Sequence, residues 1–564
     1  MKMARVGVLL DRAFADKRWS HGMNVFEGYV TEVLAHAGIP FRETASTAEI
    51  GRDRFDVVIV ALAEETEENA SRLLSFAEQG GVVIGYAGLN KLAGKLGCVE
   101  RPSVAPGYAF LPDADVPLRF LHARPWLVEE EKTGSASGTG YLRKDSPNGA
   151  KSGAALLRFP VGEGFVDRWA VDIPGTIVGL QQGTAPVWED GVPARDGSGE
   201  VAEGILKADD RCEMDWELDR LKTETGAPYF AHPYADYWRE ALLSHLLGRV
   251  VGMGLTLPFL GPWPEGVPHV AMISHDSDIN QDVHAEAALD VLQECGIQST
   301  WCMIEPGYSP SIYERVKEAG HELAFHYNAL DQQDGRWGAD EFARQFDWLK
   351  KATGLQKVTS NKNHYTRFEG WGELFRFCET HGIEAEQTRG PSKKGNIGFL
   401  FGTAQPYFPI AWSDERNRYY DVLVVGFLTQ DLDHRHLADS SVAEPFLDGV
   451  MRVEGVAHFL FHQVHIKEQP MVTDAVRKVV REARKRGFVF WTCKQINDWV
   501  RARRRVAIRD VDASGLVIVD NAAGLENVVV WVPVDAEEAA NGPTELKFGI
   551  PCRKQIVTKQ TVSA

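Results

Sequence analysis

Apolar residues in the first hundred positions follow two alternating patterns. Short unbroken apolar runs, typical of buried parallel strands, alternate with segments whose apolar residues recur every three or four positions, typical of helices. The strand-like runs are RVGVLL, FDVVIVALA and VVIGYAG, and the helix-like segments span residues 23–39 and 68–81. This alternation predicts a flavodoxin-like α/β domain with a parallel sheet.

The pattern changes after this first region. From residue 98 to about 225 the helical period is lost, and Gly, Pro and short runs such as FVDRWAVDI predict a β-rich elaboration. A helix is expected over residues 234–252. The stretch LPFLGPWPEGVP, with four prolines, is typical of an interdomain linker, so the first domain is expected to span residues 1–262.

A regular strand–helix rhythm resumes at residue 269 and continues to about residue 503. The strand candidates are VAMIS, STWCMI, HELAF, KVTSN, IEAEQ, VLVVGF, AHFLFH and FVFWT. Seven or eight βα units in residues 263–503 predict a closed or nearly closed βα barrel. Residues 504–564 contain GLVIVDN, NVVVWVPV and TELKFGI between turn residues, which favours a small β-sandwich.

Charge and cysteine content narrow the possible partners and location. The formal net charge of −18 argues against a nucleic-acid or anionic-membrane partner, because phosphate binding depends on Lys and Arg. No apolar stretch approaches a membrane span, and the apolar run at the N-terminus is too short for a signal peptide. The seven cysteines lack CxxC spacing, which fits a reducing compartment. We therefore expect a cytoplasmic protein.

Polar residues follow most of the predicted barrel strands. They are Asp276 and Asp278, Glu305, His326, His364, Arg389, and His462 with His465. Because the carboxyl ends of barrel strands share one face, these side chains are expected to meet there. The two aspartates could instead cap a helix, and His321 and His465 could have only structural roles. Capping, however, does not require such groups on separate βα loops.

This set of residues favours metal-assisted hydrolysis. Of two carboxylates at one strand end, one can bind a divalent cation while the other accepts a proton from water. Imidazoles from neighbouring strands would complete the ligand set, and His462 would protonate the leaving group. Mixed Asp and His ligation suits zinc, and Fe, Co, Ni or Mn are also compatible.

The motifs ISHDSD, GHELAFH, NHYTRF and HFLFHQVH resemble those of the polysaccharide deacetylase (NodB homology) superfamily, in its divergent His-Asp-x-Asp branch. The resemblance covers residues 269–503. It implies a distorted (β/α)7-type barrel and hydrolysis of an amide or ester on a carbohydrate.

The same resemblance assigns roles to individual residues. It implies that Asp276 is the catalytic base, that Asp278 and His326 bind the metal, and that His462 assists the leaving group. Leu330 occupies the position of the family's second metal-binding histidine. His364 from the next strand would replace it. The alternatives are an incomplete metal site or a contribution from Asp331.

Substrate contacts are expected from Arg389, Tyr327, His465 and Glu305. Aromatic residues near the same face can stack on sugar rings or belong to the barrel core, and the core is preferred for two of them, Trp301 and Trp491. The others are Trp337 and Tyr365.

The N-terminal region is similar to class I glutamine-amidotransferase-like folds, such as the trimerisation domains of some β-galactosidases. It offers no cysteine nucleophile at the expected turns. A role in subunit contact or substrate positioning, and hence a homo-oligomer, is therefore expected.

Two other functions fit the same residues. A glycoside hydrolase would pair Asp276 with Glu305 or Glu386, at a carboxyl separation of about 5 to 10 Å. A non-catalytic carbohydrate-binding relative is compatible with Leu330. Bound metal would distinguish the deacetylase from the glycosidase.

Overall fold

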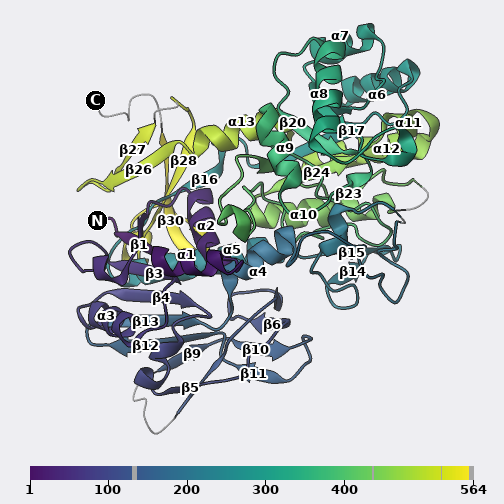
Figure 1. The fold of residues 1–564 in the computed structure, drawn as a ribbon. Helices are drawn as coiled ribbons and strands as arrows, with labels where there is room; N and C mark the ends of the chain where they lie inside the picture. The colour runs from purple at the N-terminus through teal and green to yellow at the C-terminus, as the bar shows by residue number, and fades with distance from the viewer. Residues whose placement is uncertain (130–135, 203, 435–436, 522–523, 558–564) are drawn as a thin grey trace.

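The computed structural model describes residues 1–129, 136–202, 204–434, 437–521 and 524–557. Figure 1 shows an N-terminal region in purple and blue, a barrel-like region in green and C-terminal strands in yellow. Within these ranges, no helix is both long and apolar enough to cross a membrane.

The N-terminal domain is built on a seven-stranded sheet with the order β2-β1-β3-β4-β13-β12-β9. The first five strands in this order are parallel, as the alternation of strands and helices predicts. Val, Ile and Leu fill β1, β3 and β4, which are buried almost throughout because helices cover both faces of a parallel sheet. The strands are β1 (Val6–Leu10), β2 (Arg42–Thr44), β3 (Val57–Leu62), β4 (Val82–Tyr86), β9 (Ser137–Thr139), β12 (Leu156–Val161) and β13 (Gly164–Trp169).

The region 98–225 is β-rich, as expected, but three of its described strands, β9, β12 and β13, belong to the main sheet. Its strand β13 lies parallel to β4, with Trp169 opposite Tyr86, and therefore completes the main sheet. Composition could not show this pairing, because the partner strand lies far back in the chain. The remaining strands form three small sheets: β5 (Cys98–Glu100) with β8 (Trp126–Val128); β6 (Gly107–Phe110), β7 (Leu118–Phe120), β10 (Tyr141–Lys144) and β11 (Lys151–Gly153); and β14 (Arg220–Lys222) with β15 (Pro228–Phe230).

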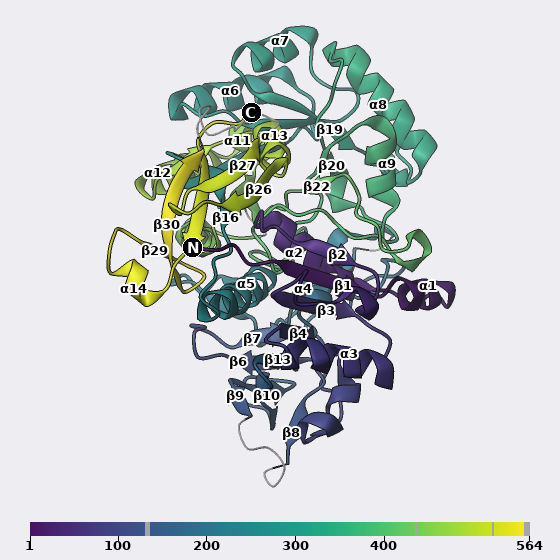
Figure 2. The same cartoon turned by 90° about the vertical axis from the view of Figure 1, so that its left-hand side faces the viewer.

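Helices α4 and α5 lie near the centre in both views, next to strands of the N-terminal sheet and below the barrel region (Figures 1 and 2). Helix α5 (Tyr234–Gly252) occupies the predicted range and contacts both parts. Its Trp238 packs edge-on against Trp169 of the sheet, with ring centroids 6.2 Å apart. Its Asp236 accepts a hydrogen bond from the backbone N–H of Ala404 at 2.7 Å. The other helices of this domain are α1 (Arg12–Ser20), α2 (Val30–His36), α3 (Glu67–Glu78) and α4 (Ile173–Gln182).

The barrel region is a sheet of parallel strands in the order β22-β21-β20-β19-β18-β17-β24-β23, with β25 also paired to β17. Among the described residues, no pairing joins β22 to β23, so the barrel is open there. The strands are β17 (His269–Asp276), β18 (Thr300–Met303), β19 (Glu322–Tyr327), β20 (Ser360–Asn363), β21 (Ala385–Glu386), β22 (Leu423–Val424), β23 (Thr429–Gln430), β24 (Val456–Leu460) and β25 (Phe488–Phe490).

Helices separate most of these strands, as the sequence rhythm predicts. They are α6 (Asp282–Cys295), α7 (Pro310–Glu318), α8 (Ala339–Thr353), α9 (Glu373–His381), α10 (Ala443–Val453), α11 (Gln463–Glu468), α12 (Pro470–Lys485) and α13 (Cys493–Arg503). Each of the eight strands predicted from the sequence contains or overlaps an observed strand. The two-residue strand β23 was not expected.

The C-terminal strands form two small sheets around one apolar cluster. The expected linker is part of this unit, because β16 (Phe259–Pro264) pairs antiparallel with β28, and Phe259 lies opposite Trp531. The prolines are tolerated since β16 is an edge strand. The boundary expected at residue 262 therefore falls inside a strand. The other strands are β26 (Val506–Val511), β27 (Val517–Asn521), β28 (Val528–Pro533), β29 (Glu545–Lys547) and β30 (Ile550–Val557).

Replacing Leu260 with Ala tests this assignment of β16. Leu260 is buried in the C-terminal apolar cluster, so the substitution should lower the free energy of unfolding by about 2 to 5 kcal/mol in urea denaturation. Leu546→Ala is the matched control, because that side chain is largely exposed and should cost little. Equal, small effects of both substitutions would mean that residues 257–268 are a linker after all.

Candidate functional site

Five of the residues singled out in the sequence lie at the carboxyl ends of barrel strands. Asp276 is the last residue of β17 and Asp278 follows it, while His326 lies near the end of β19. His364 directly follows β20, and His462 follows β24. These strands are parallel neighbours in one sheet, so their carboxyl ends open on the same face.

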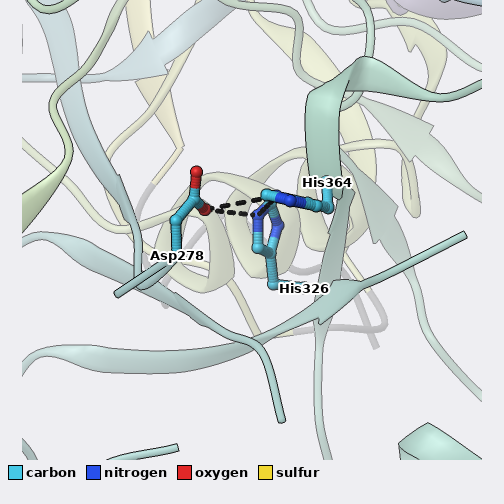
Figure 3. Close-up of side chains that lie close together, drawn as sticks. All are labelled: Asp278, His326 and His364. Carbon is cyan, nitrogen blue, oxygen red and sulfur yellow. Dashed lines mark hydrogen bonds and ion pairs between the residues drawn. The ribbon is translucent and has the colours of Figure 1, made fainter. Parts of the chain in front are cut away.

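Three of these side chains converge on one point, as Figure 3 shows. The Asp278 Oδ1 atom lies 3.2 Å from His326 Nε2 and 3.3 Å from His364 Nδ1. The two ring nitrogens are 3.3 Å apart. Both imidazoles are buried, whereas the carboxylate is partly exposed, so the cluster is accessible from one side.

The orientation of both imidazoles is fixed by hydrogen bonds on their far sides. His326 Nδ1 donates to the Lys362 carbonyl at 2.8 Å, because a carbonyl oxygen can only accept. His364 Nε2 donates to the side-chain oxygen of Gln333 at 2.7 Å. In the neutral rings, the remaining nitrogens then present lone pairs toward each other and toward Asp278.

This arrangement fits a divalent cation. Two lone pairs and a carboxylate oxygen at these separations repel one another unless a positive charge lies between them. Two imidazoles and one carboxylate, with carbonyl or amide oxygens behind the imidazoles, are the donor set of many zinc sites. Asp278, His326 and His364 are therefore the residues that would hold the metal.

The position of the missing family histidine is filled by a core residue. Leu330 is buried, and the neighbouring Asp331 is exposed. Among the described residues, Asp331 does not belong to the group of Asp278, His326 and His364, whose side chains could hold a metal ion. Instead, Gln333 from the same segment supports His364. The structure thus brings His364, rather than Asp331, to the other two ligand candidates.

Asp276 forms an ion pair inside the barrel with a residue that the sequence analysis did not single out. The Lys362 Nζ atom lies 3.1 Å from Asp276 Oδ1, and the lysine side chain is fully buried. Burial raises the pKa of Asp276, but Lys362 and the imidazoles of His326 and His462 outweigh it and hold the pKa below its ordinary value. Asp276 is therefore anionic and able to accept a proton.

A chain of hydrogen bonds fixes the position of Lys362. Its Nζ atom donates to Ser274 Oγ at 2.6 Å, and Ser274 Oγ in turn lies 2.7 Å from His458 Nε2. Burial and the nearby Lys362 lower the pKa of His458 to about 3, so its imidazole is neutral. Its Nδ1–H then faces the carbonyls of Val425 and Gly426, and Nε2 accepts the serine proton.

His462 is paired with a second carboxylate that the sequence analysis also missed. Asp431 accepts hydrogen bonds from the backbone N–H and from the Nδ1 of His462, and its Oδ2 lies 2.9 Å from His465 Nδ1. Burial lowers the pKa of His462, but Asp431 and Asp278 outweigh this effect and raise the pKa to about 10. The charged imidazole directs Nε2 toward Asp278 Oδ2, at 3.5 Å.

Three of the residues expected to contact substrate are buried or bonded to other side chains. Tyr327 is 0% exposed, and its hydroxyl is bound within its own segment to the Gly338 carbonyl at 3.2 Å. Arg389 is buried with its guanidinium 4.8 Å from the ring centre of Phe368. Glu305 is paired with Arg344 at 2.9 Å. Burial removes Tyr327 and Arg389 from a substrate-facing position.

The aromatic residues divide along the same lines. Trp301 is fully buried, as the core assignment predicts. Tyr365 is 47% exposed and packs edge-on against the metal-ligand candidate His364, with ring centroids 4.7 Å apart. Tyr365 and Thr366 both have positive φ, a strained conformation for residues other than glycine. Tyr365 is therefore an exposed aromatic ring directly beside the metal-ligand candidates.

A segment of the N-terminal domain forms part of the rim of this site. Val187 exchanges backbone hydrogen bonds with Gly370, and Leu206 accepts one from Phe368 N–H at 3.0 Å. The Lys207 Nζ atom lies 5.3 Å from the centre of the exposed Tyr365 ring. These contacts place residues 184–202 and 204–211 beside the loop that carries His364.

The comparisons with known proteins find only distant structural similarity. No protein-family model matches the sequence, and a search of curated proteins found no significant match. Among solved structures, a protein from Mycobacterium smegmatis assigned as a polysaccharide deacetylase shares 15% identity at a TM-score of 0.32, over 43% of this chain and 93% of that one.

Two other solved structures are similar to parts of the chain. One is BA3943, a CE4 family pseudoenzyme from Bacillus anthracis, with 12% identity and a TM-score of 0.25 over 42% of this chain and 67% of that one. The other is a cold-adapted β-galactosidase from Rahnella sp. R3, with 16% identity and a TM-score of 0.24 over 30% and 28% of the two chains. At such values the function has to be inferred from the residues of this chain.

Substitution of the candidate metal ligands tests the metal site. Purified protein should contain a divalent metal, and His364→Ala should abolish stoichiometric binding in zinc titrations followed by elemental analysis. Gln333→Ala removes only the support of His364 and should weaken binding by about 10- to 100-fold. Asp331→Ala is the control and should bind normally. Unchanged binding by His364→Ala together with a loss in Asp331→Ala would reverse the assignment.

Substitution of Lys362 tests the buried ion pair with Asp276. Lys362→Met leaves Asp276 without its cationic partner and should lower the free energy of unfolding by about 3 to 5 kcal/mol in urea. Adding Asp276→Asn should recover part of this loss. The matched control is Lys357→Met, which breaks an exposed pair with Glu384 and should cost about 1 kcal/mol or less. Equal costs for the two lysine variants would contradict a strong buried pair.

Proposed function

We propose that the chain is a metal-dependent hydrolase that removes an acyl group, such as acetyl, from a sugar or oligosaccharide. One observation carries this proposal: an anionic carboxylate, Asp276, and a positively charged imidazole, His462, both adjoin the Asp/His/His cluster on the same barrel face. Acyl transfer to water requires both groups, a base for the attacking water and an acid for the leaving group.

Asp276 is suited to accept the proton of the attacking water. Lys362 keeps its carboxylate charged, and the hydrogen-bonded chain through Ser274 and His458 keeps Lys362 in place. A divalent cation held by Asp278, His326 and His364 would supply Lewis acidity toward the water and the acyl carbonyl, and zinc is the best match to this donor set.

His462 is suited to donate a proton to the departing amine or hydroxyl. Asp431 holds the ring through Nδ1, so the proton available for transfer is on Nε2, the nitrogen nearest the metal-ligand candidates. The hydroxyl group derived from water then remains on the acyl group, which is released as a carboxylic acid. The sugar leaves with the proton from His462. His465 shares the Asp431 carboxylate and would position it rather than contact substrate.

The carboxylates that a glycoside hydrolase would need are otherwise engaged. Glu305 is paired with Arg344, and Glu386 is fully buried and accepts a hydrogen bond from Thr388 N–H at 2.8 Å. Glycoside hydrolysis by Asp276 and a second carboxylate is therefore less well supported than the metal-assisted reaction.

Acetate release tests the reaction itself. The metal-loaded protein should release acetate from acetylated sugars or oligosaccharides, and Asp276→Asn or His462→Gln should lower kcat by about 10²- to 10⁴-fold. Chelation should abolish activity, and added zinc should restore it. Glu305→Gln is the control and should retain activity, because Glu305 belongs to a separate ion pair.

Other outcomes of this experiment would select the alternatives. Release of free sugars without acetate would identify a glycosidase. Saturable sugar binding with no hydrolysis across the panel, and no effect of chelation, would identify a carbohydrate-binding relative.

A further inference from the structure

A second cavity lies in the N-terminal domain, at the carboxyl ends of its parallel strands. It has a volume of about 430 Å³ and is lined by helix α1, by the segments after β3 and β4, and by the first residue before α4. Strands β2 and β3 lie on opposite sides of β1, so the direction in which successive strands are added to the sheet reverses at β1. Such a switch point is where open α/β sheets bind ligands, and the volume is in the usual range of about 300 to 1,000 Å³.

One polar group at this cavity has no partner. Tyr86 is the last residue of β4, lines the cavity and is 5% exposed. Among the described residues, its hydroxyl forms no hydrogen bond. A buried hydroxyl without a partner is costly, and a bound ligand or water in the cavity would satisfy it.

The turn that follows Tyr86 is held in a strained conformation. Ala87 and Leu89 have φ of 55° and 64°, the left-handed region that residues with a side chain rarely adopt. The buried guanidinium of Arg168 fixes the turn by donating to the carbonyls of Ala87 at 3.0 Å and Gly88 at 2.8 Å. Strain maintained in this way is typical of ligand sites.

A carboxyl group lies on the other side of the cavity. Asp172 caps helix α4 by accepting a hydrogen bond from Gly175 N–H at 3.0 Å through Oδ1. Burial and the neighbouring carboxylate of Glu27 raise the pKa of Asp172 to about 7. Arg124 and His122 also line this side, so hydrogen-bond donors and acceptors face the same space.

The charges around the cavity balance when Asp172 is ionised and leave a single positive excess when it is protonated. Four cationic side chains and four acidic ones line it, with histidines counted as neutral: Lys17, Arg18, Lys91 and Arg124 against Glu27, Glu64, Glu65 and Asp172. Two of these pairs are already formed, Lys17 with Glu64 at 3.2 Å and Arg18 with Glu27 at 2.5 Å. A ligand with a net charge would therefore gain little here.

Most of the remaining lining is apolar and includes Ala61, Leu62 and Leu89. Mixed donors and acceptors above an apolar surface match a sugar ring, whose edge carries hydroxyls and whose faces carry C–H groups. We propose that the N-terminal domain binds an uncharged monosaccharide in this cavity, through Asp172 and the Tyr86 hydroxyl. Among the described residues no cysteine lines the cavity, so the thiol nucleophile of a glutamine amidotransferase has no counterpart there.

Calorimetric titration of the full-length protein with D-glucose, D-galactose and N-acetyl-D-glucosamine tests this proposal. At least one sugar should bind in the millimolar range or tighter. Asp172→Asn, which keeps a capping side chain, and Tyr86→Phe should each weaken binding by about ten-fold, the effect of one lost buried hydrogen bond. Asp278→Ala should leave this binding unchanged, which separates it from the barrel site.

Glu68→Gln is the matched control, because Glu68 lies on the same helix as part of the lining but is itself exposed. It should bind like the unmodified protein. The proposal is overturned if none of the three sugars binds, if Asp172→Asn and Tyr86→Phe bind normally, or if Asp278→Ala alone removes binding. Binding of the zwitterion L-glutamine in place of the sugars would contradict the ligand class.

Discussion

Two carboxylates at the end of one strand, Asp276 buried and Asp278 partly exposed, are the constraint on which the barrel face depends. An uncompensated buried carboxylate costs several kcal/mol, so Asp276 and Asp278 can coexist only among cationic or hydrogen-bonding partners. Lys362 provides the fixed positive charge for Asp276, and the imidazoles surround Asp278. The partners that make these carboxylates tolerable in the fold are also those that keep Asp276 deprotonated.

The site is built by more than the barrel strands. Residues 184–202 and 204–211 bond to the loops after β20 and β21. Asp209, for example, accepts a hydrogen bond from the Asn396 side chain at 2.9 Å. The wall beside Tyr365 therefore belongs to a different part of the chain from the metal-ligand candidates. This division lets the shape of the entrance vary while the reacting groups stay fixed.

Convergence of parallel strand ends made much of the site predictable, and the two-residue period of a strand explains most of what was missed. Ser274, Lys362 and His458 precede Asp276, His364 and His462 by two or four residues and so share their face. That signal was present in the sequence. By the same period, Tyr327 points away from its neighbour His326. Asp431 was harder to find, because β23 has only two residues.

The pairing of β16 with β28 has a consequence for how the chain is made. During synthesis β16 leaves the ribosome before the whole barrel, whereas its partner emerges only after the barrel is complete. Until then its apolar side chains, Leu260 among them, lack their final cover. The nascent protein thus carries an unpaired strand edge throughout barrel synthesis, and the emergence of β28 supplies its partner.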